Sequence, residues 1–405
     1  MIKIIDSIMG SGKTSWAIQM INNNPDKKYV YITPYLDEVQ RIKKECPDFE
    51  EPEATSKGEL KLDSLNRLLA EGKNIASTHA LFKLTTKETI NSLKKHDYTL
   101  IIDEVMEVVS SDDFKKDDLP TILAAKLAHI DENTGYLIWD KEDFDGSYNK
   151  VKHLCQTKSV VVIDNVALVW VFPATIFKYF KETYILTYMF DAQIQRYYFD
   201  MNKMPYEYYS VKDAGNRNYE LTEYVQSYDK SKYKINIYTG KKNDIGTVSQ
   251  GIRKSGFTRL SSTWYNNVTK DDLKRIKNNM VGYFKNDLKN SPSNSNLWTA
   301  FIKNRKDLQA SPYITGFLEC NARAMNSYRH KTAIAYVINK FINPYIVKFF
   351  KLYNIKIDEE KYALSELLQF IFRTAIRDEK EINLYIPSVR MRHLLQDWLE
   401  VPHAD

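Results

Sequence analysis

A phosphate-binding loop at the start of the chain constrains the fold more than any other feature of the sequence. Residues 2–14 read IKIIDSIMGSGKT, which is an apolar strand, a loop of small residues, and Lys-Thr at a helix start. Gly10 and Gly12, with Ser11 between them, let backbone N–H groups close around a β-phosphate. The pattern predicts a nucleoside triphosphate site.

Two side chains at the end of this loop carry the charge and the metal chemistry. Lys13 is expected to reach the β- and γ-phosphates, and the Thr14 hydroxyl to bind Mg²⁺. The following helix directs its positive dipole end at the same phosphates. Ser7 stands where the usual pattern has its first Gly. A chance glycine loop is the alternative, but the order of strand, loop, Lys-Thr and helix argues against it.

Composition places the chain among ordinary globular proteins with room for two or three domains in 405 residues. The most apolar stretch, residues 160–177, is interrupted by Asp164, Asn165 and Pro173, so a buried pair of strands is expected and not a membrane span. The three cysteines are scattered, lack zinc-ligand spacing and fit a reducing cytosol. We therefore expect a cytoplasmic protein without a secretory signal or membrane association.

Charge is unevenly distributed along the chain. Residues 1–200 carry a net charge of about −6 and residues 201–405 about +12, which together give the +6 of the whole chain. Residues 251–350 hold 17 basic and 5 acidic side chains. Such a basic segment favours a polyanionic partner, although a solvated lysine-rich surface explains the charge equally well.

The first half repeats an apolar strand, a polar turn and a helical pattern. Alternating strands and helices predict right-handed crossovers and a doubly wound parallel sheet. The phosphate loop follows the carboxyl end of its strand, where ligands bind in such sheets. The strands are expected at Ile2–Ile5, Tyr29–Ile32, Asn74–Ser77, Thr99–Ile102 and Tyr184–Leu186.

The remaining organisation is read from changes in this pattern. We expect a first lobe over residues 1–200, with an irregular acidic surface insertion at about 110–159. A polar, tyrosine-rich connection is expected over 201–232, and a second α/β lobe without a phosphate loop over 233–405. The second lobe is expected to contain strands at Lys234–Tyr238, near Phe257–Leu260, at Ile314–Leu318 and at Ile382–Ile386.

A second chemical signal is the strand Leu100-Ile101-Ile102 that ends in Asp103-Glu104. Beside a phosphate loop, Asp103 is expected to hold Mg²⁺, usually through water, and Glu104 to polarise the attacking water as a general base. Taken alone, Asp-Glu at a strand end is more often only a polar terminus.

At this point the chain resembles helicases of superfamily 2 with a DEAD-like order of motifs, and especially bacteriophage replication helicases. The resemblance covers nearly the whole chain. It implies two RecA-like lobes, with ATP and Mg²⁺ as cofactors. Motif I corresponds to residues 10–14, and motif II to residues 103–106, which read Asp-Glu-Val-Met and depart from DEAD in the last two letters.

The resemblance also assigns residues that would contact nucleic acid. Thr33, in a segment like motif Ia, and Ser77 and Thr78, in the next such segment, lie at strand ends where phosphates can dock; taken singly, helix capping explains them as well. Thr187 falls in a segment like motif III, which couples nucleotide state to the strand-binding surface. Arg323 lies where motif V would fall and is matched only by position and polar context.

The last of the helicase-like segments along the chain resembles motif VI. The family places a Gln and two arginines on one helix, so that an arginine finger reaches the γ-phosphate in the cleft between the lobes. Gln369, Arg373 and Arg377 are spaced four and four, which would align them on one helical face. The common spacing is four and three, so the finger is either Arg373 or Arg377. An amphipathic helix with surface arginines is the alternative.

These features together predict an ATP-dependent helicase or translocase, a nucleic-acid-stimulated ATPase whose hydrolysis in the interlobe cleft drives movement along a single strand. DNA is favoured over RNA as the partner, with a role in phage replication or recombination and a monomeric state in the host cytosol. Other replication proteins are further candidate partners. The alternative is a non-helicase P-loop ATPase, of loader or packaging type, with a basic nucleic-acid-binding domain.

Overall fold

The computed structural model describes residues 1–54, 58–111, 114–246, 258–320 and 327–403, and the chain divides into two compact units. Unit 1 contains Met1–Gln226 and Asn343–Ile357, and unit 2 contains Ser227–Ile342 and Asp358–Asp405. Each unit therefore holds two separate stretches of the chain. Among the described residues, no helix combines the length and apolar character that a membrane crossing needs.

Unit 1 is built on an eight-stranded sheet in the order β13-β12-β1-β11-β5-β2-β4-β3. Neighbouring strands run parallel except β12 and β13, which are antiparallel. The central strands are continuous apolar runs, as expected for a parallel sheet that is covered on both faces. The bounds are β1 Ile2–Asp6, β2 Lys28–Thr33, β3 Phe49–Glu50, β4 Asn74–Thr78, β5 Tyr98–Asp103, β11 Glu182–Thr187, β12 Tyr206–Gly215 and β13 Asn218–Glu223. All five strands predicted for the first half are present.

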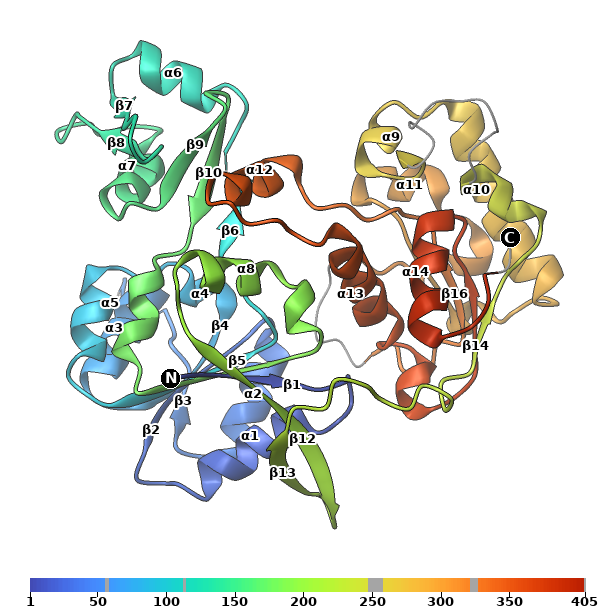
Figure 1. Cartoon of the computed structure of the whole chain (residues 1–405), viewed down its shortest axis with the longest axis horizontal. Helices are drawn as coiled ribbons and strands as arrows, with labels where there is room; N and C mark the ends of the chain where they lie inside the picture. The colour runs from blue at the N-terminus through green and yellow to red at the C-terminus, as the bar shows by residue number, and fades with distance from the viewer. Residues whose placement is uncertain (55–57, 112–113, 247–257, 321–326, 404–405) are drawn as a thin grey trace. The chain divides into compact units, whose positions relative to one another are not determined.

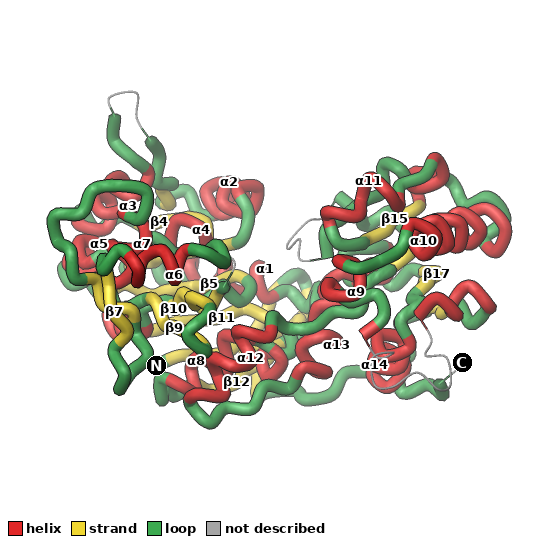
Figure 2. The backbone as a smooth tube through the Cα atoms, turned by 90° about the horizontal axis from the view of Figure 1, so that it is seen from above, coloured by secondary structure: helices red, strands yellow, loops and turns green. Residues whose placement is uncertain are grey.

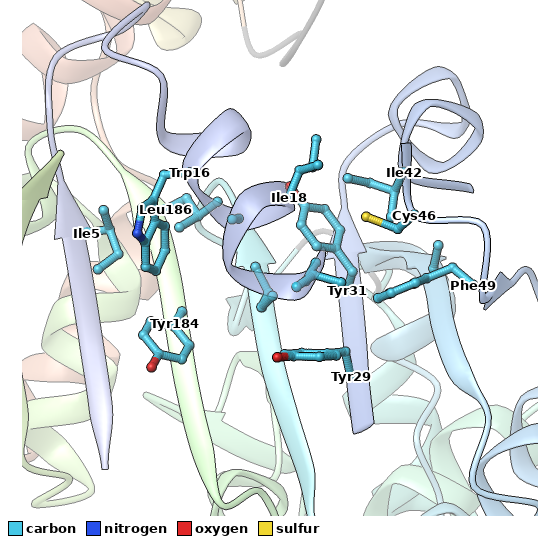
Figure 3. Close-up of a cluster of buried hydrophobic side chains, with 14 of the residues drawn as sticks. Ile5, Trp16, Ile18, Tyr29, Tyr31, Ile42, Cys46, Phe49, Tyr184 and Leu186 are labelled. Atoms are coloured by element: carbon cyan, nitrogen blue, oxygen red, sulfur yellow. The ribbon is translucent and has the colours of Figure 1, made fainter. Parts of the chain in front are cut away.

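Helices connect these strands and cover the sheet (Figures 1 and 2). Figure 3 shows one part of the core, in which Trp16 and Ile18 of α1 and Ile42 of α2 pack with the buried side chains Ile5, Tyr31 and Leu186 of the strands. The helix bounds are α1 Lys13–Asn22, α2 Leu36–Glu45, α3 Lys61–Ala70, α4 His79–Phe82, α5 Lys87–Leu93 and α8 Ile194–Met201.

A small folded subdomain stands where an irregular insertion over 110–159 was expected. It contains β6 Val109–Ser110, α6 Asp118–Ala124, β7 Ala128–Ile130, β8 Leu137–Trp139, α7 Asn149–Gln156, β9 Val160–Ile163 and β10 Ala167–Val171. Its own core includes the buried side chains of Ile122, Leu137 and Leu168. These apolar positions are widely spaced among acidic surface residues, so the sequence showed no clear helix or strand pattern here. The expected buried pair of strands is confirmed as the antiparallel hairpin β9–β10.

The helix α12, Pro344–Leu352, belongs to unit 1 although it lies late in the sequence. It packs against β9 and β10 (Figure 1). Asn343 donates from Nδ2 to the Ser111 hydroxyl at 2.7 Å, and the rings of Tyr197 and Phe350 lie 6.1 Å apart. A segment from the second half of the chain thus completes the surface of the subdomain.

The segment expected to be a connection over 201–232 is mainly part of the first sheet. Strand β12 pairs in parallel with β1, with Ile2 opposite Tyr206, and β13 returns alongside β12. Tyrosines and polar residues at an edge of the sheet made this hairpin resemble a linker, because its outer strand needs few apolar side chains. Unit 2 begins at Ser227.

Unit 2 contains a four-stranded parallel sheet in the order β14-β17-β16-β15. Its core includes Trp298, Tyr385 and Ile276, all fully buried or nearly so. The bounds are β14 Ile235–Ile237, α9 Ser262–Asn266, α10 Lys270–Gly282, β15 Asn296–Thr299, α11 Arg305–Leu308, β16 Ala333–Tyr336, α13 Glu359–Ile371, β17 Ile382–Tyr385 and α14 Val389–Leu399.

The strands predicted for the second half are only partly correct. Strands β14 and β17 match the expectation, but Ile314–Leu318 makes only one isolated bridge, between Phe317 and Trp298. The described residues of the segment near Phe257–Leu260 form turns, and Phe257 itself lies outside the described residues. Strands β15 and β16 were not predicted, because they are short and follow polar stretches.

The subdomain core predicts a clear effect of a single substitution. Leu137→Ala removes a fully buried side chain from this core and is expected to destabilise the subdomain by about 2–5 kcal/mol. Hydrogen exchange of peptides from 109–171 measures the effect. Val166→Ala is the control, because Val166 is 49% exposed in the same subdomain and should change stability by less than about 0.5 kcal/mol. Unchanged protection in Leu137→Ala would contradict a cooperative core.

Candidate nucleotide-binding site

The phosphate loop connects the carboxyl end of β1 to the start of α1. Gly10 and Gly12 adopt φ values of 84° and 93°, a backbone region that residues other than Gly rarely enter. The Lys13 ammonium group donates to the backbone oxygens of Ser7 at 2.6 Å and Ile8 at 3.2 Å. Lys13 is therefore folded onto the loop that it is expected to serve, within reach of any phosphate bound there.

The side chains that would hold a metal ion come together across the sheet. The Thr14 hydroxyl donates to Asp103 Oδ2 at 3.2 Å, and the Tyr31 hydroxyl donates to the same oxygen at 2.9 Å. Thr14 is the second residue of α1, Tyr31 lies on β2 and Asp103 ends β5. The structure thus brings together the two predicted metal-binding residues.

Burial governs the charge of Asp103. Desolvation raises the pKa of its carboxyl group to about 7, and the neighbouring charge of Glu104 acts in the same direction. The hydrogen bond from Tyr31 and the charge of Lys13 oppose this shift. A divalent cation would favour the ionised form, so the carboxylate suits a metal ligand.

The Ser11 hydroxyl gives a second sign that the site fits a ligand. It is buried and has no hydrogen-bond partner within the described parts of the chain. Buried hydroxyl groups normally have such a partner. The donors of the loop, the Lys13 ammonium group and the Asp103 carboxylate together suit a nucleoside triphosphate with Mg²⁺.

Asp6 links the loop strand to the segment that follows β11. Its carboxylate accepts from the backbone N–H groups of Met189 at 2.9 Å and Phe190 at 2.8 Å. Burial raises the pKa of Asp6 to about 6, with the two backbone hydrogen bonds opposing the shift. Asp6 was not among the predicted site residues, although an acidic residue at the end of the loop strand is a signal that the sequence contains.

Glu104 and Thr187 lie at neighbouring strand ends. Glu104 adopts φ 63° and donates its backbone N–H to Leu186 O at 2.9 Å. Thr187 is fully buried, and its backbone oxygen accepts from Ser7 N at 3.0 Å. The predicted base and the predicted coupling residue are therefore both held by backbone contacts close to the loop.

Ser7 has a structural reason for replacing the usual Gly. Its hydroxyl accepts from the backbone N–H of Val211 at 2.8 Å, and the Ser210 hydroxyl donates to Asp6 O at 3.0 Å. These bonds join the phosphate loop to β12. Glycine at position 7 could not make the first of them.

The three residues predicted to contact nucleic acid in unit 1 lie at strand ends, as expected. Thr78 accepts from Leu81 N at 3.3 Å and so caps α4, which is the alternative interpretation for this residue. Ser77 is 3% exposed. Thr33 is fully buried, and its hydroxyl has no hydrogen-bond partner within the described residues. Thr33 is therefore not a helix cap.

The predicted helical face of Gln369, Arg373 and Arg377 is not formed. Helix α13 ends at Ile371, and Arg377 lies in a separate 3-10 turn, η9, Ala375–Asp378. The Thr374 hydroxyl donates back to Ile371 O at 2.6 Å, which closes the helix. Apolar residues on both sides of this break are buried, and one straight helix could not bury them all.

The break gives the predicted residues different surroundings. Arg373 is buried, at 6% exposure, Gln369 is half-buried and Arg377 is exposed. Arg323, also predicted to contact nucleic acid, lies outside the described residues.

Comparison with known proteins gives a family and a fold. The descriptions "YonV middle domain" and "YonV C-terminal Rossmann-like domain" match residues 109–170 and 229–399. The SPbeta prophage-derived uncharacterized protein YonV of Bacillus subtilis (strain 168) is 43% identical over 418 residues, which cover 98% of each chain. The middle-domain match coincides with the folded subdomain.

Solved structures resemble the whole chain at low sequence identity. The structure "XPD_APO" matches with a TM-score of 0.51 and 13% identity, over 100% of this chain and 96% of that chain. The structure of S. tokodaii Xpd4 matches with a TM-score of 0.47 and 13% identity, over 99% and 94% of the two chains. The likeness to XPD, together with the parallel sheets, confirms the predicted α/β fold class.

The buried carboxylate of Asp6 predicts a dependence of stability on pH. Its pKa is about 6 in the fold and about 3.9 in an unfolded chain, so ionisation costs the folded state stability as pH rises from 4 to 7. Asp6→Asn should remove this cost, and its stability relative to the parent should rise by about 2 kcal/mol over that range.

Hydrogen exchange of β1 and β11 amides at pH 4.5 and 7.5 measures this change. Lost hydrogen bonds in Asp6→Asn alter stability equally at both pH values, so only the difference between them tests the prediction. A mutant-to-parent difference that stays constant with pH would contradict it.

Proposed function

This chain belongs to the YonV family, and we propose that it is a nucleic-acid-stimulated ATPase of helicase type. The observation that carries the proposal is the Thr14–Asp103 hydrogen bond of 3.2 Å, which places a phosphate-loop hydroxyl beside the acidic end of β5. This pairing is what a Mg²⁺–triphosphate site requires. The order of helicase-like motifs along the chain, on a fold that resembles XPD, supports the helicase type.

The residues of unit 1 would divide the work of hydrolysis. Lys13 would exchange the carbonyls of Ser7 and Ile8 for the β- and γ-phosphates, and Thr14 and Asp103 would hold the metal ion. Mg²⁺ supplies charge stabilisation at the phosphate oxygens. Glu104 orients the attacking water and accepts its proton.

The remaining assignments extend this proposal to unit 2 and to the nucleic acid. Arg377 is favoured over Arg373 as the finger that stabilises charge on the γ-phosphate, because Arg377 is exposed and Arg373 is buried. Gln369 would assist it. Thr78 and Arg323 are proposed to contact a single strand, while Thr33 and Ser77, which are buried, would position the ends of β2 and β4 for that contact. Thr187 would couple the contact to the phosphate loop through its bond to Ser7.

The biological setting is proposed from the description of the relative and from the charge of the chain. The relative from Bacillus subtilis is prophage-derived by its description, which favours a role in phage DNA replication or recombination. The basic second half of the chain suits single-stranded DNA. We propose that the protein acts as a monomer in the cytosol of the host.

Turnover of ATP with and without single-stranded DNA or RNA tests the proposal. The parent should be stimulated by nucleic acid, and stimulation should fall steeply with salt. Lys13→Ala should lose ATP binding, because the phosphates lose their cation. Glu104→Gln should bind ATP nearly normally and hydrolyse it at least about 10²-fold more slowly. Normal hydrolysis by Glu104→Gln would remove it as the base, and turnover that ignores nucleic acid would contradict the helicase assignment.

Arg377→Ala tests whether unit 2 takes part in hydrolysis. We expect normal ATP binding and a loss of about 10³-fold in the single-turnover rate with nucleic acid bound, because the transition-state charge loses its partner. Lys380→Ala, an exposed basic residue just after η9, is the matched control and should retain the parental rate. Parental hydrolysis by both Arg377→Ala and Arg373→Ala would exclude an arginine finger from this segment.

A further inference from the structure

Tyr219, at the start of β13, lies directly against the phosphate loop. A methyl group built on Gly12 would come within 2.1 Å of Tyr219 Cε1 and 2.3 Å of Cδ1. Two features therefore require glycine at position 12. The backbone is left-handed, with φ 93°, and the Tyr219 ring occupies the space that a side chain would need. The ring is half-buried and also contacts the core beneath the sheet.

The hairpin that carries Tyr219 is fastened to the loop and to α1. Gln19 of α1 accepts from Tyr219 N at 3.0 Å through Oε1 and donates to Arg217 O at 2.6 Å through Nε2. On the other strand of the hairpin, Ser7 Oγ accepts from Val211 N at 2.8 Å. These bonds fix the position of the hairpin backbone that carries the ring.

The order of strands around the phosphate loop indicates toward which strands the nucleoside of a bound triphosphate would extend. Strands β11 and β5 lie on one side of β1, and β12 and β13 on the other. The metal-binding end, marked by the contact of Thr14 with Asp103, is on the β5 side. A triphosphate that crosses the loop with its γ-phosphate toward β5 extends its nucleoside toward β12 and β13, where Tyr219 lies.

We propose that Tyr219 is the nucleoside-contacting residue of this site, with its ring serving as a stacking platform for a purine base. The inference rests on the proposed ATP site. An aromatic ring binds the face of a base, and every base has such a face. Recognition of this kind favours the larger purines over pyrimidines but separates ATP from GTP poorly, because it does not read hydrogen-bonding edges.

Calorimetric titration of the full chain with Mg²⁺-ATP and with inorganic tripolyphosphate tests the proposal, because tripolyphosphate lacks the nucleoside. Tyr219→Ala should weaken ATP binding about 10-fold or more and leave tripolyphosphate binding within about 2-fold. Tyr219→Phe keeps the ring and should bind both ligands as the parent does. The parental preference for ATP and GTP over CTP and UTP should disappear in Tyr219→Ala. A thermal melt of each variant checks folding.

Several outcomes would overturn the assignment. Equal weakening of both ligands in Tyr219→Ala would mean that the ring only shapes the loop, and equal tightening would mean that it covers the loop. Unchanged ATP binding would exclude the contact while leaving the proposed ATPase intact. A parent that binds neither ligand would instead remove the proposed function, and this inference with it.

Discussion

The shared register of β1, β11 and β5 is the constraint on which the candidate site depends. Asp6 lies opposite Thr187, and Leu186 lies opposite Asp103. Neighbouring strands are about 4.8 Å apart, so the carboxyl ends of three strands deliver their polar residues to one small region. A slip of one residue would turn a carboxylate to the other face of the sheet. The buried carboxylate of Asp6 opposes that slip, because it accepts hydrogen bonds from the backbone N–H groups of Met189 and Phe190.

The same burial gives the site its unfavourable electrostatics. The pKa values of Asp6 and Asp103 are both raised by desolvation. Hydrogen bonds partly offset the cost of burying the two carboxylates. Asp6 accepts from the backbone of Met189 and Phe190, and Asp103 accepts from the hydroxyls of Thr14 and Tyr31. Partly compensated buried carboxylates are a cost that proteins tend to accept at functional sites. A metal ion at Asp103 would reduce this cost, which links ligand binding to the stability of unit 1.

Short-range sequence patterns were enough to predict the strands of the first sheet and the phosphate loop. The strands of the first sheet and the loop with Lys13 and Thr14 follow from apolar runs and from glycine placement. The spacing of Arg373 and Arg377 was misleading, because a helix that continued through Thr374 could not bury the apolar residues on both sides of it. The place of helix α12 in unit 1 could not be predicted from local patterns, because it depends on contacts between distant residues such as Asn343 and Ser111, which are 232 residues apart.

The hairpin β12–β13 shows how a departure from a motif can indicate a tertiary contact. Ser7 weakens the match to the usual loop pattern, yet its hydroxyl is the acceptor that attaches β12 to the loop. The same attachment brings Tyr219 to Gly12, although Tyr219 is 200 residues from its hydrogen-bond partner Gln19. A glycine at position 7 would keep the phosphate cradle and release one anchor of the hairpin. The substitution therefore exchanges conformational freedom of the loop for a fixed position of the aromatic ring beside it.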